Sequence, residues 1–283
     1  MIRHHFTVDV EDWFQVSAME PYVERSAWDG IPCRVEANTH LILDLLAEAD
    51  ARGTFFVLGW VAERYPALVR AIADGGHEVA SHGRGHRRVT TLSPERFRAS
   101  VRRSKATLEE VTGLEVLGYR APSFSIVAGS EWALDVLLEE GYRYDSSLFP
   151  VRRRGYGYAG GARDPHLIHR PAGELAEVPP ATLTVAGKTL PAGGGAYFRL
   201  FPYALVGAAL RSAERRGAAA TFYIHPWEVD PEQPRIPVSA ATRIRHYGGL
   251  RRTVPRLRRL LREFSFQTIA RTLNLEPEPC PQR

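Results

Sequence analysis

Three acidic residues follow an apolar, β-branched run near the start of the 283-residue chain: Asp9, Glu11 and Asp12 in "TVDVEDW". Asp and Glu are poor strand formers, and a buried carboxylate is costly unless it is paired or binds a metal. We therefore expect this strand to end in side chains that have a chemical task.

Further polar groups follow apolar runs along the chain: His82 and His86 in "SHGRGH", Arg120 in "YRAPSF", Asp145 in "YDSS" and His225 in "YIHPWE". The carboxyl ends of parallel strands meet on one face of an α/β fold, and active sites lie on that face. The five polar strand ends therefore predict one composite site.

The spacing of His82 and His86 is i, i+4, which on a helical turn places both imidazoles on one side. Two imidazoles and one carboxylate, with positions left for water and substrate, are typical of a hydrolytic zinc site. The sequence therefore predicts a metal centre built from this pair and an acidic residue of the first strand.

Two other strand ends have roles that follow from their side-chain chemistry. We expect Arg120 to pair with a buried carboxylate, because guanidinium offers a fixed bidentate geometry. We expect His225 to act as a general acid, with Trp227 as an apolar wall beside it. The remaining histidines, His246 among them, have no assigned role and are mostly expected at the surface.

These residues must be positioned by alternating strands and helices. Apolar runs predict strands over 5–10, 54–58, 78–81, 116–119, 143–146, 219–224 and 265–267. Helical periodicity lies between them over 37–53, 93–113, 130–142 and 202–216, and strand–helix alternation indicates an α/β fold with a parallel sheet or barrel.

Several helix ends have recognisable caps. Ser93 and Pro94 are expected at the start of one helix and Gly113 at its end, whereas Ser130 and Gly141 are expected to bound the next. A basic amphipathic helix over 250–264 is expected to pack on the body of the protein.

We expect one catalytic domain over residues 1–283. The stretch 148–200, rich in Gly, Arg and Pro, is expected to be an insertion with short hairpins, because loops of this length are usually functional or disordered. The Pro-rich stretch 275–283 is expected to be a flexible tail.

The composition sets broad limits on function and location. A net charge of +5 and a pI near 9.4 are mildly basic and suit an acidic substrate. No basic patch is interleaved with aromatic residues, so no nucleic-acid partner is expected. The sequence has no apolar run of membrane-spanning length and no signal-peptide pattern, which makes the cytoplasm the expected location.

The motifs "TVDVEDW", "SHGRGH", "RAPSF", "YDSS" and "YIHPW", in this order, resemble the polysaccharide deacetylases of carbohydrate esterase family 4, with their NodB-type homology domain. More narrowly, "FTVDVEDWFQV", "GGGAYFRLFPY" and "FYIHPWEVDPEQPR" resemble the deacetylases of exosortase (PEP-CTERM) exopolysaccharide loci. The resemblance implies a distorted (β/α) barrel of about seven parallel strands. It also implies Zn²⁺ or another divalent metal such as Co²⁺, and removal of N-acetyl groups from an amino-sugar polysaccharide in an exopolysaccharide assembly system.

The resemblance also implies roles for individual residues. Asp9 matches the catalytic base, Arg120 the arginine that holds it, and His225 the acid that protonates the leaving amine. Asp145 matches an aspartate that orients or tunes that histidine. A peptide N–H near Ser123 or Phe124 matches the donor to the oxyanion.

One position departs from the family pattern, in which a second aspartate follows the first directly and binds the metal. Val10 stands there, so the ligand is either Glu11 or Asp12. Strand alternation puts Asp9 and Glu11 on one face and favours Glu11. A turn after Val10 would instead bring round Asp12, the side chain type that the family uses, and we favour Asp12.

The aromatic residues Phe124, Tyr223 and Trp227 are candidates for an acetyl pocket or sugar platform, although core packing explains them equally well. Two other functions stay open. One is hydrolysis of a cyclic amide or ureide of the allantoinase type on the same fold. The other is a metal-free carbohydrate-binding scaffold, against which the five polar strand ends argue.

Overall fold

A nine-stranded sheet forms the centre of the molecule in the computed structural model, which describes residues 2–153 and 155–280. Its strands are β1 (His4–Val10), β2 (Thr54–Val57), β3 (Glu78–Ser81), β4 (Gly118–Tyr119), β5 (Tyr144–Asp145), β6 (His166–Arg170), β7 (Gly173–Glu177), β10 (Thr221–Ile224) and β11 (Phe266–Gln267). The order is β10-β1-β2-β3-β4-β5-β7-β6, and β11 pairs with the start of β1. All seven predicted strands are confirmed, and every strand pair that the structure describes in this sheet is parallel except β6–β7.

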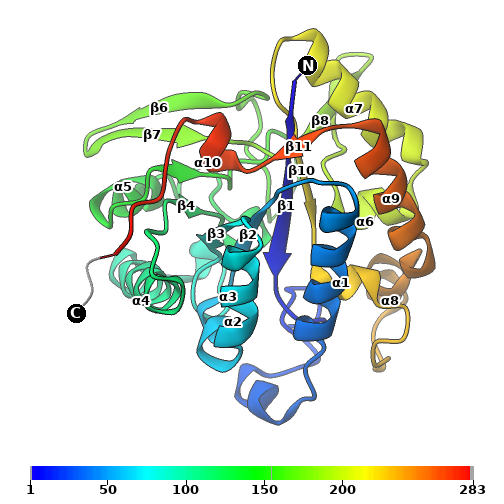
Figure 1. Ribbon diagram of the computed structural model, residues 1–283, viewed down its shortest axis with the longest axis horizontal. Helices are drawn as coiled ribbons and strands as arrows, with labels where there is room; N and C mark the ends of the chain where they lie inside the picture. The colour runs from blue at the N-terminus through cyan, green and yellow to red at the C-terminus, as the bar shows by residue number, and fades with distance from the viewer. Residues whose placement is uncertain (1, 154, 281–283) are drawn as a thin grey trace.

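The sheet curls so that its two edges approach each other. Beyond β7 the chain returns to β10, where Pro180 lies opposite Thr221 in a parallel bridge and the N–H of Ala181 donates to the carbonyl of Thr221 at 2.9 Å. With β1 in the middle and helices outside (Figure 1), the architecture is the distorted (β/α) barrel that the resemblance implied.

The helices are α1 (Val35–Glu48), α2 (Gly59–Arg64), α3 (Pro66–Asp74), α4 (Pro94–Thr112), α5 (Trp132–Glu139), α6 (Gly195–Leu200), α7 (Tyr203–Arg215), α8 (Ala240–Tyr247), α9 (Thr253–Glu263) and α10 (Ile269–Thr272). The caps of α4 are as predicted: Ser93 Oγ accepts from the N–H of Arg96, and Gly113 has φ +70°. The predicted cap of α5 is wrong, because the hydroxyl of Ser130 bonds to Val127 and Glu131 precedes the helix.

The predicted basic helix consists of a short 3₁₀ turn (Leu250–Arg252) followed by α9. Its leucines are buried against the body, at positions 250, 257, 260 and 261. Among the described residues, no helix has the length and apolar character needed to cross a membrane.

The expected insertion is more closely integrated than the sequence indicated. Its β7 is a strand of the main sheet, parallel to β5, and only β8 (Thr182–Val185) and β9 (Lys188–Pro191) form a separate hairpin. The glycine run before α6 lies directly against β10. Gly194 has φ +145°, and a Cβ there would lie 1.8 Å from the carbonyl oxygen of Tyr223, so only glycine fits.

The chain end was expected to be free from Leu275 onwards, but part of it is bonded to the body. The N–H of Glu115 donates to Glu278 O at 2.9 Å, and that of Cys280 donates to Gly113 O at 2.8 Å. Residues 281–283 of the expected tail lie outside the described residues.

Candidate active site

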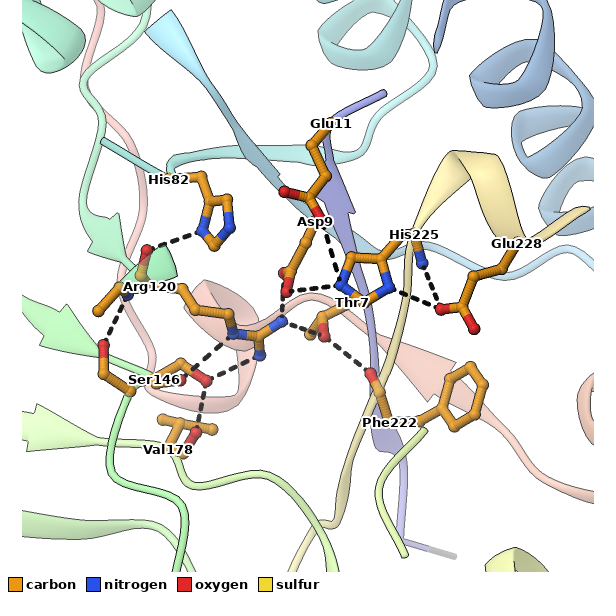
Figure 2. A network of polar contacts seen from close by, with 12 residues as sticks. Thr7, Asp9, Glu11, His82, Arg120, Ser146, Val178, Phe222, His225 and Glu228 are labelled. Carbon is orange, nitrogen blue, oxygen red and sulfur yellow. Dashed lines mark hydrogen bonds and ion pairs between the residues drawn. The ribbon is translucent and has the colours of Figure 1, made fainter. Parts of the chain in front are cut away.

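Asp9 and Arg120 form a buried ion pair at the centre of the site (Figure 2). Asp9, near the end of β1, is 2% exposed, and Arg120, directly after β4, is 0% exposed. Arg120 Nη1 donates to Asp9 Oδ1 and to Thr7 Oγ1, both at 2.7 Å, while its Nη2 donates to Ser146 Oγ at 2.8 Å. Burial by itself would raise the pKa of Asp9, but Arg120, His82 and His225 outweigh it and lower that pKa. Asp9 is therefore an ionised carboxylate whose position is fixed by Arg120.

Glu11, His82 and His86 form a group whose potential ligand atoms all lie within 4.8 Å of one another. His86 Nε2 lies 2.7 Å from Glu11 Oε2, and both side chains are 2% exposed. His82 Nδ1 donates a hydrogen bond to the carbonyl oxygen of Arg120 at 2.8 Å, which leaves Nε2 as the ring nitrogen that can bind a metal. Burial lowers the pKa of His82 to about 4, so the imidazole is neutral, as a ligand must be. This donor set fits zinc.

The two histidines come together in a loop and not on the helical turn that their spacing predicted. His86 has φ +49°, a left-handed conformation that is uncommon outside glycine. Arg25 supports the loop by donating to the carbonyl of His86 at 3.1 Å and to that of Gly85. The backbone strain at His86 thus turns its ring towards Glu11.

The preference for Asp12 as the metal carboxylate is corrected by this geometry. Asp12 Oδ2 accepts from the N–H groups of Arg34 at 2.6 Å and Val35 at 2.9 Å, and Oδ1 accepts from that of Trp13 at 2.8 Å. The side chain therefore caps the start of α1, and the alternation argument that favoured Glu11 gives the observed arrangement.

His225 follows β10 and faces the same pocket. Its Nε2 lies 3.5 Å from Glu11 Oε1 and 3.8 Å from Asp9 Oδ2, and its Nδ1 lies 2.6 Å from Glu228 Oε1. Burial by itself would lower the pKa of His225, but the bond to Glu228 and the charges of Glu11 and Asp9 raise it to about 9. The ring is therefore an imidazolium at neutral pH, as a general acid requires.

Glu228 is the partner of His225 that the sequence analysis missed. It forms a fully buried ion pair with Arg199 of α6, and although burial would raise the pKa of Glu228, Arg199 and His225 lower it to about 2. The signal was present in "YIHPWE", where the acid stands three residues after the histidine.

Asp145 does not contact His225, which corrects the role that the family resemblance gave it. Its Oδ1 accepts from Ser147 Oγ at 2.6 Å and its Oδ2 from the N–H of Ser147 at 3.1 Å. It also meets Glu177 across the β5–β7 pairing, and burial first, then the charge of Asp145, raises the pKa of Glu177 well above its ordinary value. Burial also raises the pKa of Asp145, so it favours the protonated form of both carboxyls.

Asp9, Glu11, His82, His86 and His225 line a pocket of about 310 Å³, whereas Arg120, Asp145 and Glu228 are not among its lining residues. The predicted substrate residues Ser123, Phe124, Tyr223 and Trp227 all line it. Phe124 and Tyr223 meet edge to face at 5.0 Å, and Trp227 stacks on His225 at 5.4 Å. Lining residues that the sequence analysis missed are Arg88, Tyr156, Tyr197, Arg245 and His246. His246 was expected at the surface, but it is 1% exposed because it stacks on Trp227 at 4.2 Å.

Two family models match this chain in adjacent regions. Residues 26–144 match the model described as polysaccharide deacetylase, and residues 146–274 match a domain of unknown function, DUF3473.

Several relatives that are named as deacetylases match this chain over short segments. A peptidoglycan deacetylase-like protein of Gibberella zeae is 33% identical over 107 residues, 38% of this chain and 30% of the relative. A peptidoglycan-N-acetylglucosamine deacetylase of Bacillus cereus is 29% identical over 98 residues, 34% of this chain and 36% of the relative. A chitooligosaccharide deacetylase of Rhizobium leguminosarum is 37% identical over 70 residues, 25% of this chain and 33% of the relative. The chain spans about a third of the length of these relatives.

Solved structures share the fold over almost the whole chain. A putative polysaccharide deacetylase of Mycobacterium smegmatis has a TM-score of 0.65 and 21% identity over 99% of this chain and 94% of its own. An allantoinase reaches a TM-score of 0.61 at 16% identity, over 96% and 89% of the two chains. Fold similarity by itself therefore does not separate the two activities.

Proposed function

We propose that this chain, whose residues 26–144 match the polysaccharide deacetylase model, is a metal-dependent hydrolase that removes N-acetyl groups from an amino-sugar polysaccharide. One observation supports this above all. An ionised carboxylate, Asp9, and an imidazolium, His225, flank the Glu11, His82 and His86 group within one pocket. Separated pKa values of this kind divide base from acid. The narrower resemblance favours an exopolysaccharide as the polymer.

Glu11, His82 and His86 would hold the metal, Zn²⁺ or Co²⁺. Such an ion would polarise the acetyl carbonyl and lower the pKa of water towards about 7. Asp9 takes a proton from the attacking water, while Arg120 fixes the carboxylate that receives it. His225 gives its proton to the sugar nitrogen as the C–N bond breaks, and the products are acetate and a free amine. Exchange with solvent then restores both side chains.

The pocket wall supplies orientation. The N–H of Phe124 already donates to Ala121 O at 2.9 Å, so of the two predicted oxyanion donors we favour Ser123. Both residues have a left-handed backbone, with φ +56° and +51°, which turns this segment into the pocket. Phe124, Tyr223 and Trp227 provide apolar surface for the acetyl methyl group and the sugar ring.

The test is acetate release by the purified protein from an N-acetylglucosamine pentamer, before and after chelation and with Zn²⁺ or Co²⁺ restored. We expect activity that is lost on chelation and regained with metal. A lack of acetate release from every amino-sugar substrate with either metal would exclude the deacetylase. Ring opening of allantoin would then support the ureide hydrolase, and glycan binding without turnover would support the scaffold.

A further inference from the structure

The rim of the pocket is positively charged. Arg88 and Arg245 line it, Arg88 half-buried and Arg245 exposed. Among the described lining residues the only carboxylates are Asp9 and Glu11, which lie deep in the pocket and are already paired with Arg120 and His86. The charge of the two rim arginines is therefore not balanced from within the pocket.

Arg88 is held in place but keeps hydrogen-bonding capacity. Its Nη2 donates to Glu20 Oε2 at 3.0 Å, and the same carboxylate also pairs with Arg25. One negative charge thus serves two guanidinium groups, and Arg87 beside them is exposed. The Nε of Arg88 is buried and has no hydrogen-bond partner among the described residues. Arg88 is therefore a positioned cation with an unused donor.

Arg245 lines the pocket from α8. Its carbonyl accepts from Arg199 Nη2 at 2.8 Å, so the backbone that supports it is tied to the buried Arg199–Glu228 pair. The side chain has no ion pair within 2–153 or 155–280. Next to it, the hydroxyls of Tyr156 and Tyr197 are bonded at 2.7 Å. Burial first, then that bond, raises the pKa of Tyr156, and the charge of Arg245 opposes the rise, as expected for close neighbours.

From this arrangement we propose that the substrate is an acidic glycan, and that Arg88 and Arg245 bind a carboxylate or phosphate on it near the N-acetylated sugar. The inference rests on the proposed deacetylase activity and adds the charge of the substrate to it. A neutral glycan would need only aromatic surface and hydroxyl partners, which the tyrosines supply. Arginine instead suits carboxylate and phosphate groups, and a rim with excess positive charge concentrates anions at the mouth of a cleft.

The test compares oligosaccharides that differ only in charge. The probes are a glucuronate–N-acetylglucosamine oligosaccharide, the same oligosaccharide after reduction of its carboxyls, and an N-acetylglucosamine oligomer with and without a terminal phosphate. With the zinc-loaded enzyme at low salt, we expect kcat/KM to be about tenfold higher for one charged probe than for its neutral match, mostly through KM. The preference should shrink as salt rises, because the rim is exposed.

Substitutions of the two rim arginines test whether they cause the preference for charged probes. R88Q and R245Q should each lower kcat/KM several-fold more for the preferred charged probe than for its neutral match. R243Q is the matched control, because Arg243 is exposed on the same helix but is not among the lining residues, and it should leave the preference unchanged. The charged probe that shows the effect identifies the anion as carboxylate or phosphate.

Failure of this inference and failure of the proposed function look different. Acetate release at equal kcat/KM from charged and neutral probes, or from neutral probes only, would contradict the proposal of an acidic substrate. It would still support the proposed deacetylase activity. If no probe is deacetylated, the affinity of each probe for the zinc-loaded protein, measured by calorimetry, decides. Equal affinities, or losses in R88Q and R245Q no greater than in R243Q, would then overturn the anion site.

Discussion

The three carboxylates near the end of the first strand are chemically similar, but Asp9, Glu11 and Asp12 each have different partners. Asp9 is bonded to Arg120 and lies 3.8 Å from His225, but it is not in the group that can hold a metal. Its substitution by Asn should therefore remove the base and keep the ligands. We expect D9N to lose about 10² to 10⁴ in kcat with unchanged zinc content by elemental analysis. Full activity in D9N would exclude Asp9 as the base.

Mutation should distinguish the role of Glu11 from that of Asp12. E11A removes a ligand, so we expect zinc affinity to fall by at least tenfold in a chelator competition. D12A leaves two backbone N–H groups at the start of α1, and that of Trp13, without their acceptor, and should cost about 2 to 3 kcal/mol of unfolding free energy in the metal-free protein. The reverse pattern, with zinc lost in D12A at unchanged stability, would return the ligand role to Asp12.

The role of His225 as general acid should depend on Glu228. With Gln at position 228, His225 loses the charge that most favours its protonated form, so its pKa falls. Because the protonated ring is the active form, the alkaline limb of the kcat profile should move to lower pH in E228Q, with kcat lower by about tenfold or more and zinc content unchanged. E232Q is the control, because Glu232 is exposed and outside the pocket. An unshifted alkaline limb in E228Q would exclude the role of Glu228.

At this scale the sequence predicted which residues meet but not every partner. His82, Arg120 and His225 were found because each directly follows an apolar strand, and His86 was found because it lies four residues after His82. Asp12 and Asp145 were misassigned because their partners, the backbone at Val35 and the carboxyl of Glu177, are distant in the sequence. Pattern matching indicated a carboxylate at each place, and only tertiary structure decides what it bonds to.

At the level of elements, the glycine run before α6 shows how the site is built. Gly194 lies opposite Tyr223 on β10, and the N–H of Tyr223 donates to Gly193 O at 2.7 Å. This contact brings α6, with Tyr197 and Arg199, to the pocket. The run had the composition of a loop, so its sequence gave no sign of a pairing with β10.

Substitution of this glycine should be severe for two separable reasons. G194A combines a backbone region that is almost exclusive to glycine with a Cβ 1.8 Å from Tyr223 O, and we expect a loss of about 3 kcal/mol or more in urea unfolding. G187A is the control, since Gly187 has φ +74° but no atom within 4 Å of its Cβ position, and should cost about 1 kcal/mol. Equal losses would mean that β10 yields to the extra methyl group.

Strands and capped helices were predicted well because period and caps are local signals. The strands β4 and β5 are only two residues long, shorter than their apolar runs, because only those residues pair with a neighbouring strand in register. The hairpin strand β7 was assigned to an insertion, since its composition resembles a loop and only its pairing with β5 makes it part of the barrel.

Over the whole molecule, the site needs both matched regions and the first strand. His82, His86 and Arg120 lie within 26–144, whereas His225 and Arg245 lie within 146–274 and Asp9 and Glu11 precede both. The β5–β7 pairing joins the two regions, and Asp145 faces Glu177 there. The stability of this junction therefore bears on the integrity of the active site.

This junction should make stability depend on pH. The pKa of Glu177 is raised in the folded protein by burial and by Asp145, so the folded state holds a proton that the unfolded state releases. Its contribution is complete below the unfolded value, near 4.5, and is lost as pH rises through the folded value. While the folded state keeps this proton, the unfolding free energy falls by about 1.4 kcal/mol per pH unit through this group.

E177Q should remove that slope. The Gln oxygen still accepts from the N–H of Leu148, bonded at 3.0 Å in the native protein, and its amide donates to Asp145 at any pH. Urea unfolding from pH 4 to 8 should show E177Q no more stable than the native protein at pH 4 and increasingly more stable towards pH 8. E174Q, an exposed change on the same strand, should run parallel to the native curve. A difference between E177Q and the native protein that is constant with pH would show that the folded Asp145–Glu177 pair binds no extra proton.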